Sequence, residues 1–520
     1  SGKTEVYLRL IDRALRGGRS ALLLVPEISL TPQLSARLEQ RFEDQVSIWH
    51  SGISAGQRYD TWRGLRSGEI KVLLGARSAC LANIADLALI ILDEEHDGSY
   101  KQSNPSPRYN AKTVALERAR REGAMVLFGS ATPDVVTYYQ AEKQDRILEL
   151  PERVHKQAMP AVDIVDMRLE LQAGNKSIFS LSLKNEIESR LNSKEQIILL
   201  INRRGYASHV FCRACGYVVD CGRCSVAMVY HRHSSYGSER KYLACHHCGA
   251  HKPMTISCPE CTSPFIKEYG LGTQKVEESV KELFPQARVT RLDSDITSRK
   301  GAFKEVLDSF IRSDADILIG TQMVAKGLDI ANVTLVGVLA ADAALNMPDY
   351  RSSERGFQLL SQVAGRAGRG DLPGLVILQT YTPELPLLDW ARRHDFKSFL
   401  EAELVGRKNL SYPPFSRIIR IVVSGANLEE VEKQCSILSK GLMSLLPAPV
   451  LATESHANNS QAVEVLGPAP CLIERIKGMF RYHLLVKADC QPELISDILG
   501  WLRLFTAEEN IRIAIDVDAL

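Results

Sequence analysis

Residues 87–96, LALIILDEEH, place an acidic cluster directly after an unbroken run of six apolar residues. Such a run is typical of a strand that is buried on both faces of a parallel sheet. At the carboxyl end of a strand of this kind, one carboxylate can hold a metal ion while the next polarises a water molecule. We therefore interpret Asp93 and Glu94 as functional residues rather than as part of a solvated acidic turn.

Short apolar runs and amphipathic segments alternate on both sides of this stretch. The apolar runs predict strands at residues 21–25, 72–74, 87–92 and 125–128. The amphipathic segments predict helices at residues 4–16, 31–42 and 111–122. This alternation predicts an α/β lobe over residues 1–155, with helices wound around a parallel sheet.

A second set of the same kind follows. Its predicted strands are at residues 197–201, 289–292, 316–319, 333–339 and 375–378, and its predicted helices are near 274–284, 301–312 and 353–364. We assign residues 156–206 and 265–383 to this second α/β lobe, with an insertion at 207–264. The pattern loosens from about Pro383, with breaks at residues 412–415 and 453–461. Residues 384–520 are expected to form a separate α+β domain.

The composition limits the classes of protein to which the chain can belong. A length of 520 residues suggests about three or four domains. A net charge of +2 excludes a uniformly basic protein, so any nucleic-acid contact must come from a local groove. No apolar stretch reaches the roughly 20 residues needed to span a bilayer. Eight of the twelve cysteines occur in Cys-x2-Cys pairs, which favours metal-bound thiolates in a reducing cytoplasm over a secreted disulfide framework.

Gly2-Lys3-Thr4 stands at the start of the first predicted helix and has the residues that end a phosphate-binding loop. In such loops backbone N–H groups cradle phosphate, the lysine reaches the β- and γ-phosphates, and the threonine hydroxyl coordinates Mg²⁺. We therefore expect Gly2, Lys3 and Thr4 to bind ATP together with Asp93 and Glu94. The first glycine of the G-x4-G-K-T pattern would precede the first residue, and the chain has no initiator Met. We expect the sequence to be truncated at its front end.

A glycine-spaced basic motif, QVAGRAGR, occupies residues 362–369 at the end of a predicted helix. We expect Gln362 to contact ATP, and Arg366 and Arg369 to reach across a cleft to the γ-phosphate as arginine fingers. A basic helix end favoured by the helix dipole would explain one arginine but not the whole pattern. Thr321 lies just past the predicted strand 316–319, where a contact with a DNA phosphate is expected.

Four Cys-x2-Cys pairs lie within residues 212–261, and each has the spacing of a zinc knuckle. Eight thiolates suffice for two closed zinc sites, but the spacing leaves two groupings open. Sequential pairing would join the first pair to the second and the third to the fourth. Nested pairing would join Cys212, Cys215, Cys258 and Cys261 around Cys221, Cys224, Cys245 and Cys248. The nearby histidines are expected to be solvated or DNA-facing rather than ligands: His231, His233, His246, His247 and His251.

The chain resembles superfamily-two helicases in five motifs that occur in the same order: Gly2-Lys3-Thr4, Asp93-Glu94-Glu95-His96, Gly129-Ser130-Ala131-Thr132, Gly320-Thr321-Gln322-Met323 and residues 362–369. The cysteine insertion after Asn202-Arg203-Arg204-Gly205-Tyr206 is similar to that of the PriA family, the bacterial primosomal helicases. Five further segments also match this family: Val25-Pro26-Glu27-Ile28, Gly75-Ala76-Arg77-Ser78, Ser99-Tyr100-Lys101-Gln102, Gly270-Leu271-Gly272-Thr273 and Tyr412-Pro413-Pro414-Phe415.

The resemblance implies an ATP-dependent 3′→5′ DNA helicase of the bacterial cytoplasm, which recognises stalled or abandoned replication forks and initiates primosome assembly. It implies ATP, Mg²⁺ and two Zn²⁺ per chain, with nested pairing of the cysteines. Asp93 would hold the metal and Glu94 would orient the attacking water. The implied partners are forked and single-stranded DNA, other primosome proteins and the single-stranded-DNA-binding protein. The DNA-binding residues would be Arg77, Tyr100, Arg108, Tyr109, Thr321, Lys477 and Arg481.

Two other functions fit part of the sequence. A DNA-binding loading scaffold with a dispensable motor would tolerate loss of Glu94 or Arg369, but both are present. A translocase that acts on RNA would carry the same motor motifs. The chain also departs from the PriA pattern at Pro107, where that family often has a tryptophan. Coupling between DNA stacking and ATP hydrolysis through this loop is therefore expected to be weaker.

Overall fold

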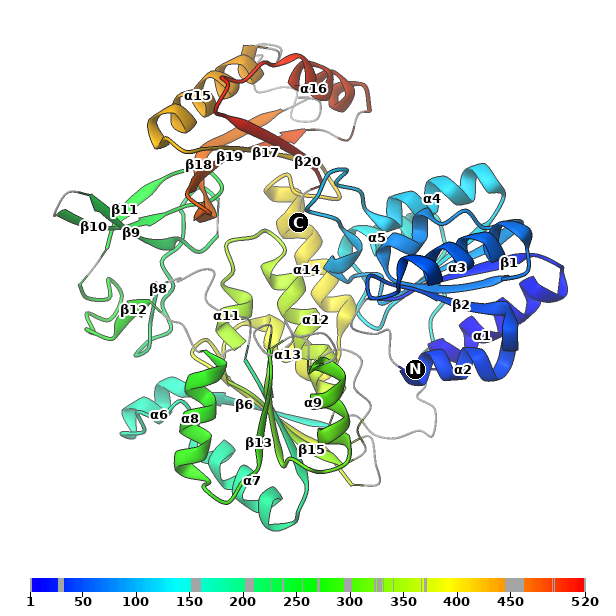
Figure 1. Ribbon diagram of the computed structural model, residues 1–520. Coiled ribbons are helices and arrows are strands. Elements are labelled where there is room, and N and C mark those ends of the chain that lie inside the picture. Colours follow the sequence, from blue (N-terminus) through cyan, green and yellow to red (C-terminus); the bar gives the residue numbers. More distant parts are fainter. Residues whose placement is uncertain are drawn as a thin grey trace. The chain divides into compact units, whose positions relative to one another are not determined.

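The computed structural model describes residues 2–26, 32–150, 160–201, 210–224, 226–235, 238–254, 256–268, 272–293, 302–321, 324, 330, 332–339, 341–365, 367–368, 372–444, 463–488, 490 and 492–518. The chain divides into two units, residues 1–158 and 159–519 (Figure 1). Within the ranges just given, no helix combines the length and the apolar character that crossing a membrane requires.

The first unit is built around a five-stranded parallel sheet with the order β2-β3-β1-β4-β5. Its strands are β1 (Ser20–Leu24), β2 (Val46–Trp49), β3 (Val72–Gly75), β4 (Leu87–Asp93) and β5 (Met125–Gly129). Its α-helices are α1 (Lys3–Arg16), α2 (Pro32–Phe42), α3 (Ala55–Ser67), α4 (Ala111–Glu122) and α5 (Val135–Lys143). The predicted strands and helices of this lobe are confirmed, and β2, α3 and α5 are additional.

The central strands of this sheet are buried on both faces. Ile90 and Leu92 of β4 pack into a cluster with α3 and α4, whereas Leu89 and Ile91 pack into a second cluster with α1 and α2. Apolar contacts on both faces account for the unbroken apolar run that predicted β4. The edge strand β2 is only half-buried and has no such run, which explains why the sequence did not predict it.

The second unit contains a six-stranded parallel sheet with the order β13-β14-β7-β15-β16-β6. Its strands are β6 (Ala161–Asp166), β7 (Gln196–Leu200), β13 (Val289–Leu292), β14 (Ile317–Gly320), β15 (Val333–Val338) and β16 (Leu375–Thr380). The associated helices are α6 (Met167–Gln172), α7 (Leu181–Asn192), α8 (Thr273–Leu283), α9 (Ala302–Ile311), α11 (Ala341–Leu345) and α12 (Ser352–Ala364). The second parallel α/β fold is confirmed, with β6, α6, α7 and α11 in addition to the predicted elements.

The cysteine-rich insertion leaves this sheet after β7 and forms two small antiparallel sheets. One pairs β8 (Val210–Cys212) with β12 (Ile266–Glu268). The other has the order β11-β10-β9 and is formed by β9 (Val229–Ser235), β10 (Ser238–Ala244) and β11 (His251–Pro253). Its core consists largely of the paired cysteines and a few valines, so the insertion has few apolar side chains with which to stabilise itself.

The last part of the chain is α+β, as predicted. An antiparallel sheet with the order β18-β19-β17-β20 is formed by β17 (Arg417–Gly425), β18 (Glu464–Ile476), β19 (Met479–Ala488) and β20 (Arg512–Val517). Helices α15 (Leu428–Ser444) and α16 (Pro492–Leu504) share its apolar core. Two further helices precede the sheet, α13 (Pro386–Arg393) and α14 (Phe396–Asn409). The predicted break at 453–461 lies outside the described residues.

A buried ion pair joins α12 to α14. Arg407 donates from Nη2 to Glu354 Oε2 at 2.7 Å and from Nε to Glu403 Oε1 at 2.8 Å. The side chains of Arg407 and Glu354 are each only 3% exposed. Because loss of either partner would leave the other charge buried and unpaired, this contact strongly constrains how the two helices pack.

Replacing Arg407 by leucine (Arg407→Leu) is expected to lower the free energy of unfolding by about 3–5 kcal/mol, since Glu354 would remain as a buried charge. Arg417→Leu is the matched control, because Arg417 pairs with Asp518 at the surface, where the two side chains are 39% and 51% exposed. The control should lose about 1 kcal/mol or less. Urea unfolding followed by circular dichroism measures both variants, and equal losses would contradict the interpretation.

Candidate nucleotide site and metal centres

Lys3, Asp93 and Glu94 meet at the carboxyl edge of the first sheet, where α1 begins and β4 ends. Lys3 Nζ lies 2.9 Å from Glu94 Oε1 and 3.5 Å from Asp93 Oδ1. Burial alone would lower the pKa of Lys3, but attraction to Glu94 and Asp93 outweighs it and raises this pKa. The lysine is therefore held as a cation between two carboxylates. A cation and two carboxylates at one sheet edge can together bind a metal–phosphate group.

The start of α1 lies at the same edge. Gly2 occupies the N-cap position with a φ of 71°, a left-handed conformation that glycine adopts without strain. No side chain caps this helix start in the described structure, so the amides of the first turn are not used by a cap and can face phosphate. Thr4, the second residue of the helix, is half-buried.

Tyr7 is a residue of this site that the sequence motifs did not reveal. Its hydroxyl donates to Asp93 Oδ1 at 2.8 Å, and burial raises the pKa of Tyr7 far above its ordinary value. The ring lies so close to Gly129 of β5 that a Cβ there would be 1.6 Å from the hydroxyl oxygen. Tyr7 therefore orients the Asp93 carboxylate. Its position four residues after Lys3, on the same face of α1, is the signal that could have identified it.

The prediction that Tyr100 contacts DNA is wrong. Its side chain is 1% exposed, and its hydroxyl donates to the backbone oxygens of Asp93 at 2.6 Å and Leu24 at 3.0 Å. A ring enclosed in this way cannot stack on a base. Tyr100 instead fixes the carboxyl ends of β1 and β4 side by side, beneath the candidate nucleotide site.

The third carboxylate of the acidic cluster has a different task from the first two. Glu95 is 1% exposed; its Oε1 accepts from the backbone N–H of Asp134 at 2.7 Å, and its Oε2 pairs with Lys112 Nζ at 3.0 Å. Next to it, His96 Nδ1 lies 2.6 Å from Ser130 Oγ. These contacts tie the end of β4 to the segment between β5 and α5. The sequence shows three adjacent acidic residues and does not distinguish their roles.

Of the three other expected DNA contacts of the first unit, Arg77 packs on the loop after β4, and Arg108 and Tyr109 lie in this loop. Arg77 Nη1 donates to two backbone oxygens within residues 99–101, at 3.1 and 3.0 Å, and its guanidinium lies 5.9 Å from the centre of the Tyr109 ring. Arg108 Nε donates to the backbone oxygen of residue 103 at 2.8 Å. Arg77, Arg108 and Tyr109 are all half-buried. Their contacts order this loop, and their binding to DNA stays a prediction.

The remaining expected site residues belong to the second unit. Thr321 follows β14 and is 8% exposed, while Gln362 is half-buried in the last turn of α12. Arg366 and Arg369 lie outside the described residues. In the C-terminal sheet, Lys477 is exposed in the turn between β18 and β19, and Arg481 of β19 is half-buried, with Nη1 3.4 Å from the backbone oxygen of residue 473.

The eight paired cysteines form two groups of four. We call Cys212, Cys215, Cys258 and Cys261 the outer site, and Cys221, Cys224, Cys245 and Cys248 the inner site. Within each group all four sulfur atoms lie within 4.8 Å of one another. The nested grouping is therefore confirmed and the sequential alternative is wrong.

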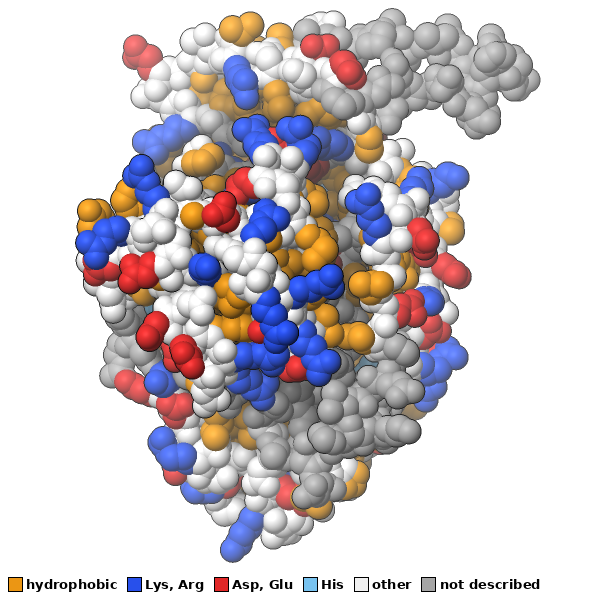
Figure 2. All heavy atoms as spheres, turned by 90° about the vertical axis from the view of Figure 1, so that its right-hand side faces the viewer, with side chains coloured by type: hydrophobic (Ala, Val, Ile, Leu, Met, Phe, Trp, Pro, Cys, Tyr) orange, Lys and Arg blue, Asp and Glu red, His pale blue; other side chains and the backbone are white. Residues whose placement is uncertain are grey.

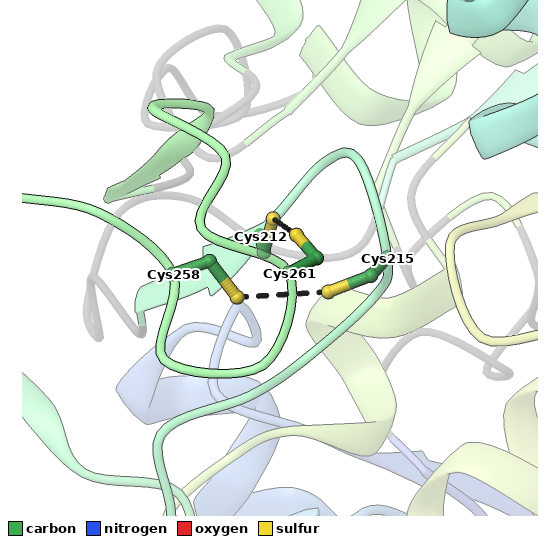
Figure 3. A group of neighbouring side chains, drawn as sticks. All are labelled: Cys212, Cys215, Cys258 and Cys261. Atoms are coloured by element: carbon green, nitrogen blue, oxygen red, sulfur yellow. Dashed lines mark hydrogen bonds between the residues drawn. The ribbon is translucent and has the colours of Figure 1, made fainter.

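The spacing of the sulfur atoms fits zinc. Four thiolates at about 2.3 Å from a tetrahedral Zn²⁺ would be about 3.8 Å apart. At the outer site Cys212 and Cys261 are separated by 3.7 Å, and Cys215 and Cys258 by 3.6 Å (Figure 3). Burial raises the pKa of Cys215 to about 12, so metal binding at neutral pH would release its proton.

Strand pairing explains the nested grouping. The antiparallel pair β8–β12 places Cys212 opposite Ile266, which brings the first and last knuckles together. The β9–β10 hairpin places Val229 opposite Ala244, the residue before Cys245, and so closes the inner site. One hairpin thus lies inside the other, and each closes on one metal site.

The prediction that the histidines of the insertion are solvated or DNA-facing is wrong for three of them. His231, His246 and His247 are 8%, 3% and 6% exposed, and burial lowers the pKa of His246 to about 4. None of the three belongs to either group of four cysteines in the described residues. His251 is exposed as expected, and the side chain of His233 lies outside the described residues.

Comparison with known families identifies three segments of the chain. Residues 1–140 match the DEAD/DEAH box helicase family. Residues 265–371 match the helicase conserved C-terminal domain, and residues 408–520 match the primosomal protein N C-terminal domain. The two helicase matches fall on the two parallel sheets, and the third falls on the C-terminal antiparallel sheet.

Three curated relatives align with the whole chain, and each is described as replication restart protein PriA. The chain is 46% identical over 526 residues to the relative from Synechocystis sp., 44% identical over 522 residues to that from Bacillus subtilis, and 36% identical over 520 residues to that from Rickettsia felis. These alignments cover 100% of this chain and 61%, 62% and 76% of the respective relatives. The chain thus spans about three fifths of the length of the first two.

The nested cysteine sites predict two zinc ions per chain. Cys215→Ser and Cys258→Ser should each reduce the zinc content to one ion, and the double variant should also retain one, because both thiolates belong to the outer site. Elemental analysis of the purified protein measures the zinc content. A double variant that retained no zinc would contradict the assignment of both residues to the same site.

The Tyr7 hydroxyl is expected to matter for binding of Mg²⁺ with nucleotide. Tyr7→Phe removes one hydrogen bond to a carboxylate, worth about 1.5–3 kcal/mol, and should weaken Mg²⁺-dependent nucleotide binding by roughly tenfold or more. Binding of nucleotide without Mg²⁺ should change much less. Calorimetric titration measures both, with Tyr59→Phe as the control because Tyr59 is 60% exposed. If the Mg²⁺ dependence of nucleotide binding were unchanged in Tyr7→Phe, Tyr7 would not contribute to this site.

Proposed function

The chain belongs to the PriA family of replication restart proteins, and from that premise we propose that it is an ATP-dependent 3′→5′ DNA helicase. Its proposed role is to recognise stalled or abandoned replication forks and to initiate primosome assembly, so that replication can restart. The observation that carries this proposal is the cluster of Lys3, Asp93 and Glu94 at the carboxyl edge of the first parallel sheet.

In the proposed reaction ATP is hydrolysed to ADP and phosphate. Lys3 and the backbone amides that follow Gly2 bind the phosphates, while Thr4 and Asp93 hold Mg²⁺, which neutralises phosphate charge when bound. Glu94 orients the attacking water. The 2.9 Å contact between Lys3 and Glu94 supports these roles, because a phosphate that replaces Glu94 as the partner of Lys3 leaves this carboxylate available to water.

Three residues of the second lobe also belong to the proposed reaction. Gln362 contacts the nucleotide, and Arg366 and Arg369 stabilise charge on the transferring phosphoryl group, since a guanidinium can donate two parallel hydrogen bonds to phosphate oxygens. The support for this assignment is the glycine-spaced motif at residues 362–369, which begins with Gln362 in the last turn of α12. We propose four domains. The first lobe comprises residues 1–155, and the second lobe comprises residues 156–206 together with 265–383. The zinc insertion comprises residues 207–264, and the C-terminal domain comprises residues 384–520.

The proposed DNA contacts are local, because the protein has no overall basic character. The net charge is +2, and on the face drawn in Figure 2 the Lys and Arg side chains are interspersed with acidic and hydrophobic ones. The residues that we propose to contact DNA are Arg77, Arg108, Tyr109, Thr321, Lys477 and Arg481. Forked and single-stranded DNA are the proposed substrates, and other primosome proteins and the single-stranded-DNA-binding protein are the proposed partners in the bacterial cytoplasm.

A DNA-binding scaffold with a dispensable motor is the second candidate function. Its support is the cysteine insertion, which is a structural module with no open metal position, since each site has four thiolates. The charged cluster at the sheet edge favours the motor. DNA-stimulated ATP hydrolysis by the full-length protein separates the two candidates, and competition by RNA tests for an RNA translocase.

Glu94→Gln is expected to abolish ATP turnover in the full-length protein while nucleotide binding is largely retained, since the carboxylate acts on water rather than on affinity. Lys3→Ala should weaken binding and turnover together, because the lysine contacts the phosphates. Steady-state hydrolysis and equilibrium nucleotide binding measure the two effects. Glu117→Gln, on the exposed face of α4, is the control. Normal hydrolysis by Glu94→Gln would show that another residue orients the water.

A further inference from the structure

The outer metal site contacts the six-stranded sheet. Arg213 donates from Nε to the hydroxyl of Tyr381 at 3.1 Å, and Arg168 donates from Nη1 to the backbone oxygen of Cys215 at 3.3 Å. Gly216 has a φ of 81°, and a Cβ at this position would lie 2.2 Å from the backbone oxygen of Tyr381. Because Tyr381 follows β16 and Arg168 lies in α6, these contacts fix the outer site to the second helicase lobe.

The inner metal site contacts the C-terminal sheet instead. His246, between two inner-site cysteines, donates from Nδ1 to the backbone oxygen of Pro470 on β18 at 2.5 Å. His483 of β19 donates from Nε2 to the backbone oxygen of His246 at 2.6 Å. Gly249, just past the knuckle, packs so closely on β18 that a Cβ would lie 2.3 Å from the backbone oxygen of Pro468. One turn of the inner site therefore holds both β18 and β19.

The adjacent His247 extends this contact to α12. Its Nδ1 lies 2.9 Å from the hydroxyl of Tyr412, in the Tyr-Pro-Pro-Phe segment that the sequence marked as a break and as a match to the family. The Tyr412 ring stacks on Tyr350 with centroids 4.8 Å apart and planes 9° apart, and Lys487 Nζ of β19 lies 4.3 Å from the centre of the Tyr412 ring. Tyr350 lies two residues before α12. The inner site, β19 and the segment that leads into α12 therefore all contact Tyr412.

We infer that the two metal sites have separate tasks: the outer site holds the insertion on the second helicase lobe, and the inner site is the docking site for the C-terminal sheet, through His246 and His247. This inference rests on metal binding at both sites and not on helicase activity.

The physical reason is that the docking contacts come from within a metal-bound turn. Two thiolates on one metal fix the backbone of the residues between them, and the residues between Cys245 and Cys248 are His246 and His247. In a module with few apolar side chains, the free energy of metal binding supplies much of the free energy of folding. Loss of the inner metal should therefore free both histidines and release β18 and β19.

Hydrogen exchange of the full-length, zinc-loaded protein tests this inference with one variant at each site. Cys248→Ser at the inner site and Cys261→Ser at the outer site should each retain one zinc ion. We expect Cys248→Ser to speed amide exchange in β18 and β19 by roughly tenfold or more, and Cys261→Ser to do so in β8 and β12 but not in β18 and β19. Loosening of the same segments by both variants, or continued protection of β18 and β19 in Cys248→Ser, would overturn the inference.

A variant that keeps all eight cysteines distinguishes loss of the docking contact from general unfolding of the insertion. His246→Ala should retain two zinc ions and still speed exchange in β18 and β19, because it removes the contact with Pro470 but no ligand. His251→Ala is the matched control, since His251 begins β11 just after the inner-site turn and is exposed, and exchange in β18 and β19 should be unchanged. Unchanged protection of β18 and β19 in His246→Ala would show that the inner-site turn does not hold the C-terminal sheet.

Discussion

Helices that cover both faces of a parallel sheet leave its carboxyl edge as the place where polar side chains can gather. In the first unit this edge receives Lys3 from the start of α1 and Asp93 and Glu94 from the end of β4. Taking these charges partly out of water would be unfavourable if they were not paired. The lysine and two carboxylates compensate one another and are held in place by Tyr7, which lies on the same helix as the lysine. The candidate nucleotide site is thus a direct consequence of the layered fold.

The insertion follows a different physical rule. Its core is formed largely by cysteines and small apolar residues, and too little apolar surface is available to stabilise a module of this size without metal. Nested hairpins bring the four knuckles together as an outer and an inner site. Metal–thiolate bonds would then take the place of a hydrophobic core, and the turns that they hold would be rigid supports for neighbouring parts of the second unit.

Buried polar contacts connect these parts within the second unit. Arg407 joins α14 to Glu354 of α12, and its guanidinium lies 5.3 Å from the centre of the Tyr350 ring, which itself stacks on Tyr412. Such a network is specific because each buried charge or ring nitrogen must find a partner of fixed geometry. Small displacements of the C-terminal sheet are therefore resisted at the start of α12, the helix that carries Gln362 in its last turn.

The sequence by itself determined the two parallel sheets, the α+β character of the last part and the eight cysteines of the two candidate metal sites. Unbroken apolar runs and paired cysteines are local signals, and they do not depend on what lies across the core. The half-buried edge strands β2 and β6 gave no such signal. Only the tertiary structure decided between nested and sequential cysteine pairing, because the choice depends on strands 54 residues apart, with Cys212 opposite Ile266. Tertiary packing also buried Tyr100 under Asp93 and His246 against Pro470. A tyrosine or a histidine has an apolar ring and a polar tip, so its sequence neighbours do not reveal whether it faces solvent or the core.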